Sequence, residues 1–441
     1  MDTRVKPAYD AELSLRGVKR RSDPDLRDGS GLLHGARKDE NSTSRESNMK
    51  PSNKFDIVVY GATGFTGQLV AEYLAAHYAG TDAPKWAMAG RSLDKLASVR
   101  DAIGAPSDTA LIVADAGDPA SLKAMVDQTR SVLTTVGPYQ FYGSELVAAC
   151  AGSGTDYLDL CGEPLWMRQM IDAHEATAKS SGARIMFSCG FDTLPFELGV
   201  FRAQEEAKKV FGAPTSRVKG RVREMRGRFS GGTAASAKAT FAAVAQDLSL
   251  VALLKNPFAL TPGFEGPKQP PGNRPVIDPD LDSWTAPFAM ALVNTRNIHR
   301  SNFLMGFPYG RDFVYDEMVL TGKGEQGEAN ARLVVAANTE KTGPDVLKPG
   351  EGPSKEERES GLYDLLFVSI GEDGRQVRAA VRGDRDPGYG STSKMISECA
   401  ICLLRDTPDV PAGIWTPGAA MGHRLIKRLV DHAGLTFEVE P

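Results

Sequence analysis

The chain has 441 residues, of which 41% are hydrophobic and 24% are charged, and its formal net charge is −4 at pH 7. This length exceeds that of a usual single domain, so we expect two domains or one domain with a large insertion. The weakly acidic balance gives no electrostatic reason to expect a nucleic-acid partner and favours small-molecule chemistry.

The first 53 residues are rich in Arg, Asp, Ser and Gly, and their few apolar residues follow no sustained period. Such a segment cannot bury enough surface to offset the entropy of ordering it, so a disordered tail is predicted at 1–53. The segment lacks the apolar centre of a signal peptide, and its acidic residues argue against an organellar transit peptide. Met49 precedes the first predicted strand and is a second candidate start of translation.

Apolar runs typical of strands alternate with helical patterns over 54–195, the predicted dinucleotide-binding domain. This alternation predicts a Rossmann fold, an α/β doubly wound parallel sheet that binds ligands at the carboxyl ends of its strands. Strands are predicted at 55–60, 85–90, 110–114, 131–136, 156–160 and 183–188, and helices begin near Gly64, Ser92, Pro119, Ser144 and Pro164.

The turn between the first strand and the first helix carries three glycines in the pattern Gly-x-x-Gly-x-x-Gly. At a helix start, free backbone N–H groups and the positive end of the helix dipole bind a pyrophosphate when no side chain blocks its approach. This spacing is one residue longer at its start than the commonest dinucleotide-binding fingerprint. The assignment to dinucleotide binding therefore depends on the strand predicted before the turn and the helix predicted after it. The predicted contacts are Gly61, Thr63, Gly64, Phe65, Thr66 and Gly67.

The second and third strands end in residues suited to the adenosine half of a cofactor. Arg91 and Ser92 stand where an NAD-binding chain usually offers an acid to the ribose, and an arginine suits a 2′-phosphate instead. We therefore predict NADP(H), although an ordinary surface arginine is the alternative. Asp115, after the third strand, is expected either to edge the adenine or to cap the next helix.

After the fourth strand, Val136, Gly137 and Pro138 are predicted to bind the nicotinamide ribose, since Gly137 lets backbone approach closely and Pro138 stiffens the turn. Tyr139 and Tyr142 follow, and the proton donor is predicted to be one of their hydroxyls, with Tyr139 preferred, or a water held there. Aromatic packing of the loop against the sheet is the alternative for both tyrosines.

Acidic side chains follow the fifth and sixth strands. Asp159 and Glu163 come after the fifth strand and Asp192 after the sixth, and each is a candidate for orienting substrate. Glu163 and Asp192 also stand where helix caps belong, so capping is an equal alternative.

Residues 196–385 are predicted to form an α+β domain for substrate binding and dimerisation. Basic residues alternate with Val218, Gly220 and Val222 in a predicted strand; the segment Ser230, Gly231, Gly232 and Thr233 then opens an Ala-rich helix reaching about Leu254. This helix start is a candidate site for a carbonyl or anionic group, or a plain N-cap. Residues 255–285 are predicted to be an irregular lid or a connecting loop, and residues 341–360 a surface loop. Strands are predicted at 311–316, 363–368 and 376–381.

The segment 386–441 is expected to return to the first domain, with helices at about 391–404 and 419–432 and a strand at 436–439. The five cysteines lie in apolar contexts typical of a reduced cytosolic protein, and Cys399 and Cys402 lack a second pair or nearby histidines. None of the six histidines has ligand spacing, so no metal site is expected. No segment is apolar enough to predict a transmembrane helix.

Several ordered motifs together resemble the saccharopine dehydrogenase-like oxidoreductases and are similar to the branch of the trans-acting enoyl reductases. They are YGATGFTG, AGRS, TTVGPY, TDYLDLCGE, CGFDTLP, FSGGT, NTRNIHRSN, DPGY and TPGAAMG. The resemblance covers nearly everything after residue 54. It implies an NADP(H)-dependent oxidoreductase in which the substrate domain is an insertion.

The resemblance further implies an enoyl reductase that acts on a lipid, acyl or polyketide-type substrate. A saccharopine-like C–N dehydrogenase and a non-catalytic NADP-binding or interaction protein are the alternatives. The expected ligand is a small, apolar acyl molecule; homodimerisation and attachment to a membrane surface stay open. The expected location is the cytoplasm.

Overall fold

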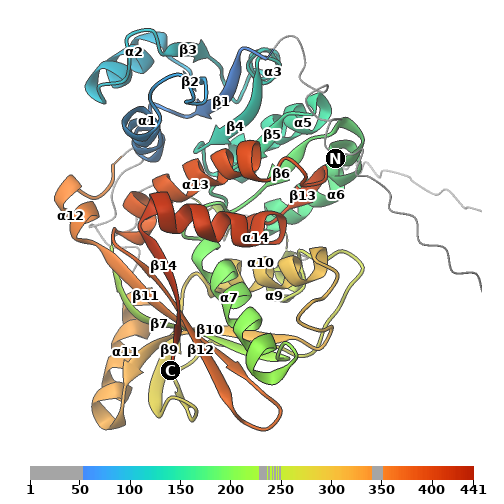
Figure 1. Ribbon diagram of the computed structural model, residues 1–441, viewed down its shortest axis with the longest axis vertical. Helices are drawn as coiled ribbons and strands as arrows, with labels where there is room; N and C mark the ends of the chain where they lie inside the picture. The colour runs from blue at the N-terminus through green and yellow to red at the C-terminus, as the bar shows by residue number, and fades with distance from the viewer. Residues whose placement is uncertain are drawn as a thin grey trace, which may run out of the picture. The chain divides into compact units, whose positions relative to one another are not determined.

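The computed structural model describes residues 53–227, 250–339 and 351–441, together with residues 236, 239, 240, 242, 245 and 247. The predicted tail and the Ser230–Thr233 segment lie outside the described residues, apart from Asn53 at the end of the tail. The compact unit Met49–Pro441 contains two seven-stranded sheets. Figure 1 shows these sheets with helices between and around them.

The first sheet is the predicted Rossmann sheet, and all its pairings are parallel. Its strand order is β13-β6-β5-β4-β1-β2-β3, so the strand order reverses between β1 and β4. In such sheets the cofactor binds at this reversal. The strands are β1 Phe55–Tyr60, β2 Trp86–Gly90, β3 Ala110–Val113, β4 Thr129–Thr134, β5 Asp156–Leu158, β6 Arg184–Met186 and β13 Gly413–Trp415.

The helices of this half begin and end at residues suited to those positions. The Ser92 hydroxyl caps α2 by accepting from Lys95 N, and Asp118 caps α3 by accepting from Ala120 N. Gly154 and Gly182 end two helices in the left-handed conformation. The helices are α1 Phe65–His77, α2 Leu93–Ala102, α3 Pro119–Val126, α4 Tyr139–Tyr142, α5 Ser144–Ser153 and α6 Pro164–Ser181.

The second sheet is mixed, with the order β14-β12-β11-β7-β10-β9-β8. Only β7 and β10 pair in parallel, and the predicted hairpin is confirmed as β11 and β12, with Leu366 opposite Ala380. Helix α7 (Leu194–Phe211) packs on β11 and β12, where Gly199 lets Phe367 approach closely. The strands are β7 Arg217–Arg226, β8 Val276–Asp278, β9 Ser283–Pro287, β10 Val314–Gly322, β11 Leu362–Ile370, β12 Gln376–Gly383 and β14 Leu435–Glu440.

Several predictions for this half were wrong. The strand predicted at 311–316 begins at Val314 and continues to Gly322, and β8 and β9 interrupt the predicted irregular segment. Short strands near the edge of a sheet give little periodic signal. Four helices were not predicted, and the last of them falls in the predicted surface loop: α7 Leu194–Phe211, α10 Ala291–Leu304, α11 Gly324–Thr339 and α12 Lys355–Ser360.

The C-terminal segment belongs to both halves. Helix α13 (Thr392–Ile401) packs on α1, where the Tyr73 hydroxyl donates to Glu398, and β13 extends the first sheet. The final strand does not return with them, because β14 pairs with β12 at the edge of the second sheet. The remaining helical segments are α9 Leu250–Lys255, η2 Pro387–Ser391, η3 Cys402–Asp406, α14 Pro417–Arg428 and η4 Leu429–Ala433.

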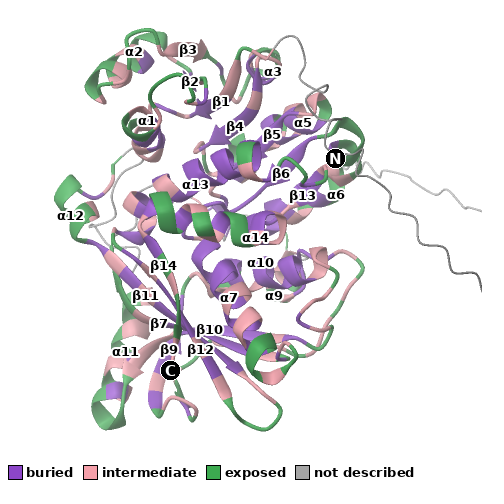
Figure 2. Cartoon of the chain, in the orientation of Figure 1, coloured by how far each residue is buried: buried purple, intermediate pink, exposed green. Residues whose placement is uncertain are grey.

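The two sheets share one hydrophobic core. A single cluster of buried side chains includes Ile57 of β1, Ile396 of α13, Phe196 of α7 and Phe367 of β11. Figure 2 shows buried residues along the strands of both sheets and along α7, α10 and α13. Because this core is continuous, the predicted boundaries at 195 and 385 separate two sheets and not two independent hydrophobic cores.

Candidate dinucleotide and substrate site

The β1–α1 turn has no room for side chains at two of its three glycines. Gly61 has a φ of 89°, and a Cβ there would lie 2.7 Å from Val136 Cγ2. A Cβ on Gly67 would lie 2.1 Å from the Gly61 carbonyl oxygen. These contacts hold the start of α1 against the end of β1, so the turn presents backbone to a ligand.

The start of α1 suits an anion. Gly64 is exposed and caps the helix without a side-chain hydrogen bond, and the first turn holds no acidic residue. The first N–H groups of a helix have no intrahelical partners, so they are available to a pyrophosphate. Phe65 fixes one side of the turn, with its ring 5.3 Å from that of Tyr389 and 5.5 Å from the Arg358 guanidinium carbon. The residues present therefore fit the phosphates of a dinucleotide.

The predicted adenosine residues lie at the ends of β2 and β3. Arg91 is exposed, and no hydrogen bond or ion pair engages its guanidinium within the described part of the chain. Burial raises the pKa of the Tyr60 hydroxyl to about 12; the negative charge of Asp115 adds to the rise, and Arg91 opposes it. Arg91 and Asp115 therefore both lie near the Tyr60 hydroxyl, at the end of β1. Asp115 also accepts from Gly117 N at 2.9 Å, within the turn that precedes α3.

The predicted nicotinamide loop is held in place by Glu163. β4 ends at Thr134, and Gly137 is exposed ahead of a cis peptide bond to Pro138. The buried Glu163 carboxylate accepts from Tyr139 N at 2.9 Å and from Gln140 N at 3.0 Å. The Glu163 side chain therefore caps α4, and it makes no capping hydrogen bond to α6, the helix that it precedes.

The two candidate tyrosines differ in exposure. The Tyr139 hydroxyl is buried, donates to Thr134 O at 3.3 Å and accepts from Leu160 N at 3.1 Å. Burial, followed by the charge of Asp159, raises its pKa well above the usual value. Tyr142 is 47% exposed. Of the two, Tyr142 has the hydroxyl that a substrate reaches without rearrangement, and both remain predicted proton donors.

The loop after β6 is built around buried polar contacts. The Asp159 carboxylate accepts from Ser188 N and Cys161 N, both at 2.9 Å, and burial raises its pKa to about 7. Ser188 has a φ of 60°, which is unfavourable for a serine, and its hydroxyl donates to Cys161 O. Strained residues of this kind persist where the surrounding contacts over-determine them, as at many binding sites.

Asp192 follows this loop and makes no hydrogen bond or ion pair within the described residues. Burial raises the pKa of its carboxyl to about 7. Its Oδ2 lies 3.9 Å from the point where a Cβ on Gly162 would stand, and Val293 of α10 lies 3.8 Å from the same point. Asp192 is therefore placed beside α10 and next to the residue that precedes Glu163.

Sequence reasoning missed Asn294 and Glu317, which meet near Asp192. The Asn294 amide donates to Glu317 Oε2 at 2.9 Å, and the Tyr315 hydroxyl donates to Glu317 Oε1 at 2.9 Å. The signal was present in NTRNIHRSN, where Asn294 and Asn297 recur at helical spacing on one buried face of α10. Glu317 gave no such signal, because it is a single acid within a strand.

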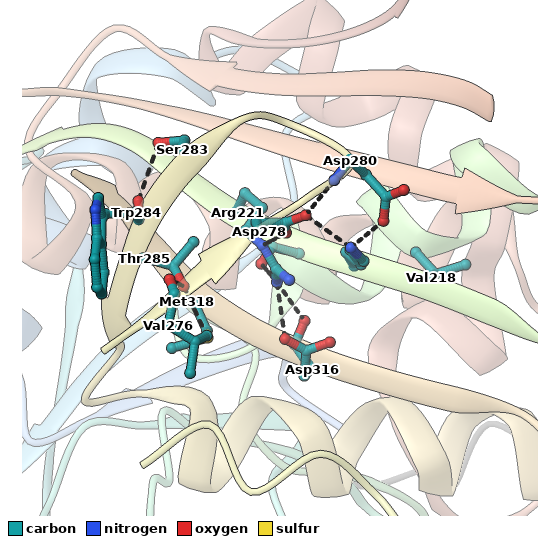
Figure 3. Close-up of polar contacts among 12 residues, drawn as sticks. Val218, Arg221, Val276, Asp278, Asp280, Ser283, Trp284, Thr285, Asp316 and Met318 are labelled. Atoms are coloured by element: carbon teal, nitrogen blue, oxygen red, sulfur yellow. Dashed lines mark hydrogen bonds and ion pairs between the residues drawn. The ribbon is translucent and has the colours of Figure 1, made fainter. Parts of the chain in front are cut away.

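A pocket of about 280 Å³ lies elsewhere, on the other face of the second sheet. Figure 3 shows its ion pairs, in which Arg221 contacts both Asp278 and Asp316 at 2.9 Å. Lys219, on the same face, pairs with Asp278 and Asp280. Since these cations are neutralised by neighbouring carboxylates, the pocket offers a ligand little unpaired charge. We assign these contacts to holding β8 and its loop on the sheet.

The described residues contain no cluster of three or more potential metal ligands. All five cysteines are buried and unpaired with one another, including Cys399 and Cys402. Across the described segments, no helix has the length and apolar composition needed to cross a bilayer.

Comparison with known proteins matches residues 57–186 to the saccharopine dehydrogenase NADP-binding domain. A trans-acting enoyl reductase from Mycobacterium tuberculosis is 37% identical over 409 residues, covering 86% of this chain and 97% of that protein. A Mycobacterium leprae protein of the same name is 35% identical with the same coverage. The chain belongs to the saccharopine dehydrogenase-like oxidoreductases, in the branch of the trans-acting enoyl reductases.

Solved structures support the same fold. Saccharopine dehydrogenase (L-Glu forming) from Saccharomyces cerevisiae superposes with a TM-score of 0.51 at 12% identity, covering 88% of this chain and 100% of that one. Homospermidine synthase from Legionella pneumophila, in complex with NAD, gives a TM-score of 0.50 at 10% identity, with 88% and 91% covered. This member of the family is an NADP-dependent oxidoreductase, as the sequence predicted.

Proposed function

We propose that this protein is an enoyl reductase that reduces the C=C bond of an α,β-unsaturated acyl thioester, with a lipid or polyketide-type acyl chain. When bound, NADPH supplies the hydride. The observation that carries the proposal is the likeness to trans-acting enoyl reductases over nearly their whole length. The open glycine turn, the unpaired Arg91 and the exposed Gly137 loop support it by fitting the cofactor.

The surroundings of the predicted nicotinamide loop suit an apolar substrate. Phe141 and Tyr142, on the short helix after that loop, are 64% and 47% exposed. Exposed aromatic side chains beside a cofactor loop favour an acyl chain over a highly charged ligand. Homodimer formation, a cytoplasmic location and contact with a membrane surface stay predictions.

The chemistry near Asp192 disfavours a saccharopine-like C–N dehydrogenase. An amino-acid substrate carries carboxylates that call for cationic partners. The Glu317 carboxyl, which Asp192 affects electrostatically, is bound to the Asn294 amide and has no cationic partner among the described residues. These groups suit a neutral carbonyl better than a carboxylate.

The test is oxidation of NADPH, followed by its absorbance, with three panels: short and long enoyl thioesters, keto acids with amines, and simple carbonyl compounds. Turnover of enoyl thioesters alone is expected. Tyr142→Phe is expected to lower kcat if Tyr142 donates the proton. Tyr139→Phe tests in the same way whether Tyr139 is the donor. Turnover of the keto acid with an amine would favour the C–N dehydrogenase. Tight NADPH binding without turnover of any panel would favour a non-catalytic protein.

A further inference from the structure

Glu317 is a buried carboxyl without a cationic partner. It lies on the face of β10 that α10 covers and is 1% exposed. Asn294 and Tyr315 each donate one hydrogen bond to it. Burial raises its pKa to about 8, and the charges of Asp316 and Asp192 add to the rise. The carboxyl therefore holds its proton at neutral pH.

The Asn294 amide is only half satisfied. Its nitrogen contacts Glu317, whereas its buried Oδ1 has no partner among the described residues. The two ends of an amide are assigned from their hydrogen bonds, and a protonated Glu317 requires an acceptor. If the Asn294 amide is rotated so that its oxygen and nitrogen exchange places, Oδ1 accepts from the Glu317 carboxyl. The NH₂ group then occupies the position of the unpartnered Oδ1. Asn294 then offers a buried donor that no described residue uses.

Asp192 supplies a second free donor at the same place. It makes no hydrogen bond within the described residues and remains partly exposed. A Cβ added to Gly162 would make ordinary contacts with Asp192 Oδ2 and Val293 Cγ2, so the Asp192 carboxyl lies beside Gly162 and α10. The next residue, Glu163, accepts from the Tyr139 N–H of the nicotinamide loop. Asp192 is thus placed beside the residue that precedes the cap of the nicotinamide loop.

We propose that Asp192 and Asn294, with Glu317 as a positioning residue, bind the carbonyl oxygen of the acyl thioester and stabilise the enolate formed from it. This inference rests on the proposed function. When a hydride adds to the β-carbon, the C=C electrons form a new double bond between the α-carbon and the carbonyl carbon. The C=O electrons move to the oxygen, which becomes the enolate oxygen. The Asp192 O–H and the Asn294 N–H donate hydrogen bonds to that oxygen. Protonation of the α-carbon by Tyr142 or water restores the C=O bond, so one hydride and one proton are added in all.

Neutral donors suit this task. A protonated carboxyl donates a hydrogen bond to a developing oxyanion, whereas an ionised carboxylate repels it. The described ionisable groups that act on Glu317 are Tyr315, on the same face of its strand, the neighbouring Asp316, whose side chain points to the other face, and Asp192. Arg217 and Arg221 pair with Asp316 on the opposite face of the sheet. The rate should therefore fall as pH rises through the range in which these carboxyls ionise.

The first experiment measures kcat against pH with a crotonyl thioester of N-acetylcysteamine. Asp192→Ala is expected to lower kcat by roughly a hundredfold or more, the usual loss for one oxyanion donor. Asp192→Asn keeps a hydrogen-bond donor that does not titrate. This variant should therefore retain more activity than Asp192→Ala, and its kcat should fall less at alkaline pH than that of the wild type. NADPH affinity, followed by fluorescence, should not change in either variant. Asp172→Asn, on the exposed side of α6, is the matched control.

The second experiment separates this inference from the proposed function. Infrared difference spectra at pH 6.5 should show protonated carboxyl bands that are lost in Asp192→Asn and Glu317→Gln. A saturated butanoyl thioester with NADP⁺ should shift the Asp192 band, whether or not the protein turns over any enoyl substrate. Absence of the bands, no shift on thioester binding, or an Asp192→Ala protein with wild-type kcat would each overturn the inference. A shift without turnover would overturn only the proposed enzyme activity.

Discussion

The β1–α1 turn and the Asp192–Asn294–Glu317 cluster are two parts of one candidate site, built in opposite ways. The turn lies within a short stretch of chain and presents backbone N–H groups, so its chemistry depends on the absence of side chains. The cluster joins side chains from the β6–α7 loop, α10 and β10, and its chemistry depends on burial of carboxyls. A site made of backbone N–H groups, such as the turn, follows from local sequence. A site made of buried side chains, such as the cluster, exists only after the second sheet packs against the first.

The sharpest way to break the first half of this comparison is Gly67→Ala. The added Cβ would overlap the Gly61 carbonyl oxygen, so the start of α1 must move. We expect NADPH affinity to fall by roughly a hundredfold or more and stability by about 1–3 kcal/mol, the usual range for overpacking. Fluorescence titration and urea unfolding measure the two effects.

Gly152→Ala is the matched control, because nothing lies within 4 Å of a Cβ at that position of α5. It should leave NADPH binding unchanged and stabilise the helix by about 0.5–1 kcal/mol. Equal behaviour of the two variants would show that the turn tolerates side chains and does not approach the cofactor closely.

A smaller effect is expected from Arg91→Ala. A guanidinium contacts a 2′-phosphate through charge-assisted hydrogen bonds that NADH cannot make. NADPH should therefore bind roughly ten- to a hundredfold more weakly, with little change for NADH. Arg91→Asp should go further by adding repulsion toward the phosphate.

Titration of both cofactors into wild type and the Arg91 variants decides the matter. The exposed Arg332 of α11, which pairs with Glu328, gives a control substitution that should change neither affinity. Equal weakening of NADPH and NADH by Arg91→Ala would remove Arg91 from the site and leave the source of NADP selectivity elsewhere.

The last prediction concerns stability against pH, through Glu317→Gln. The folded protein raises the pKa of Glu317 to about 8, so between about pH 5 and 8 unfolding releases its proton. A raised carboxyl pKa contributes stability that is lost as pH rises through this window. Replacing Glu317 by Gln removes that loss, so the variant's stability should fall less steeply, by up to about 1.4 kcal/mol per pH unit.

Urea unfolding at several values between pH 5 and pH 8 measures the two slopes. Glu328→Gln, on the exposed surface of α11, should keep the wild-type slope. Identical slopes for wild type and Glu317→Gln would mean that Glu317 is ionised in the folded protein, which would contradict its role as a neutral positioning group.

The sequence by itself determined the Rossmann half and predicted which of its loops bind the cofactor. The strands of a buried parallel sheet are continuous apolar runs, and Gly61 and Gly67 mark the turn because no other residue fits there. Tertiary structure decided what the acids do. Glu163 and Asp192 follow neighbouring strands in similar contexts, yet Glu163 accepts two backbone N–H groups, and Asp192 is left without a partner in the described structure. Glu317 gained its role only because α10 and β10 pack together, and neither burial nor the partners of a lone acid can be inferred from its sequence neighbours.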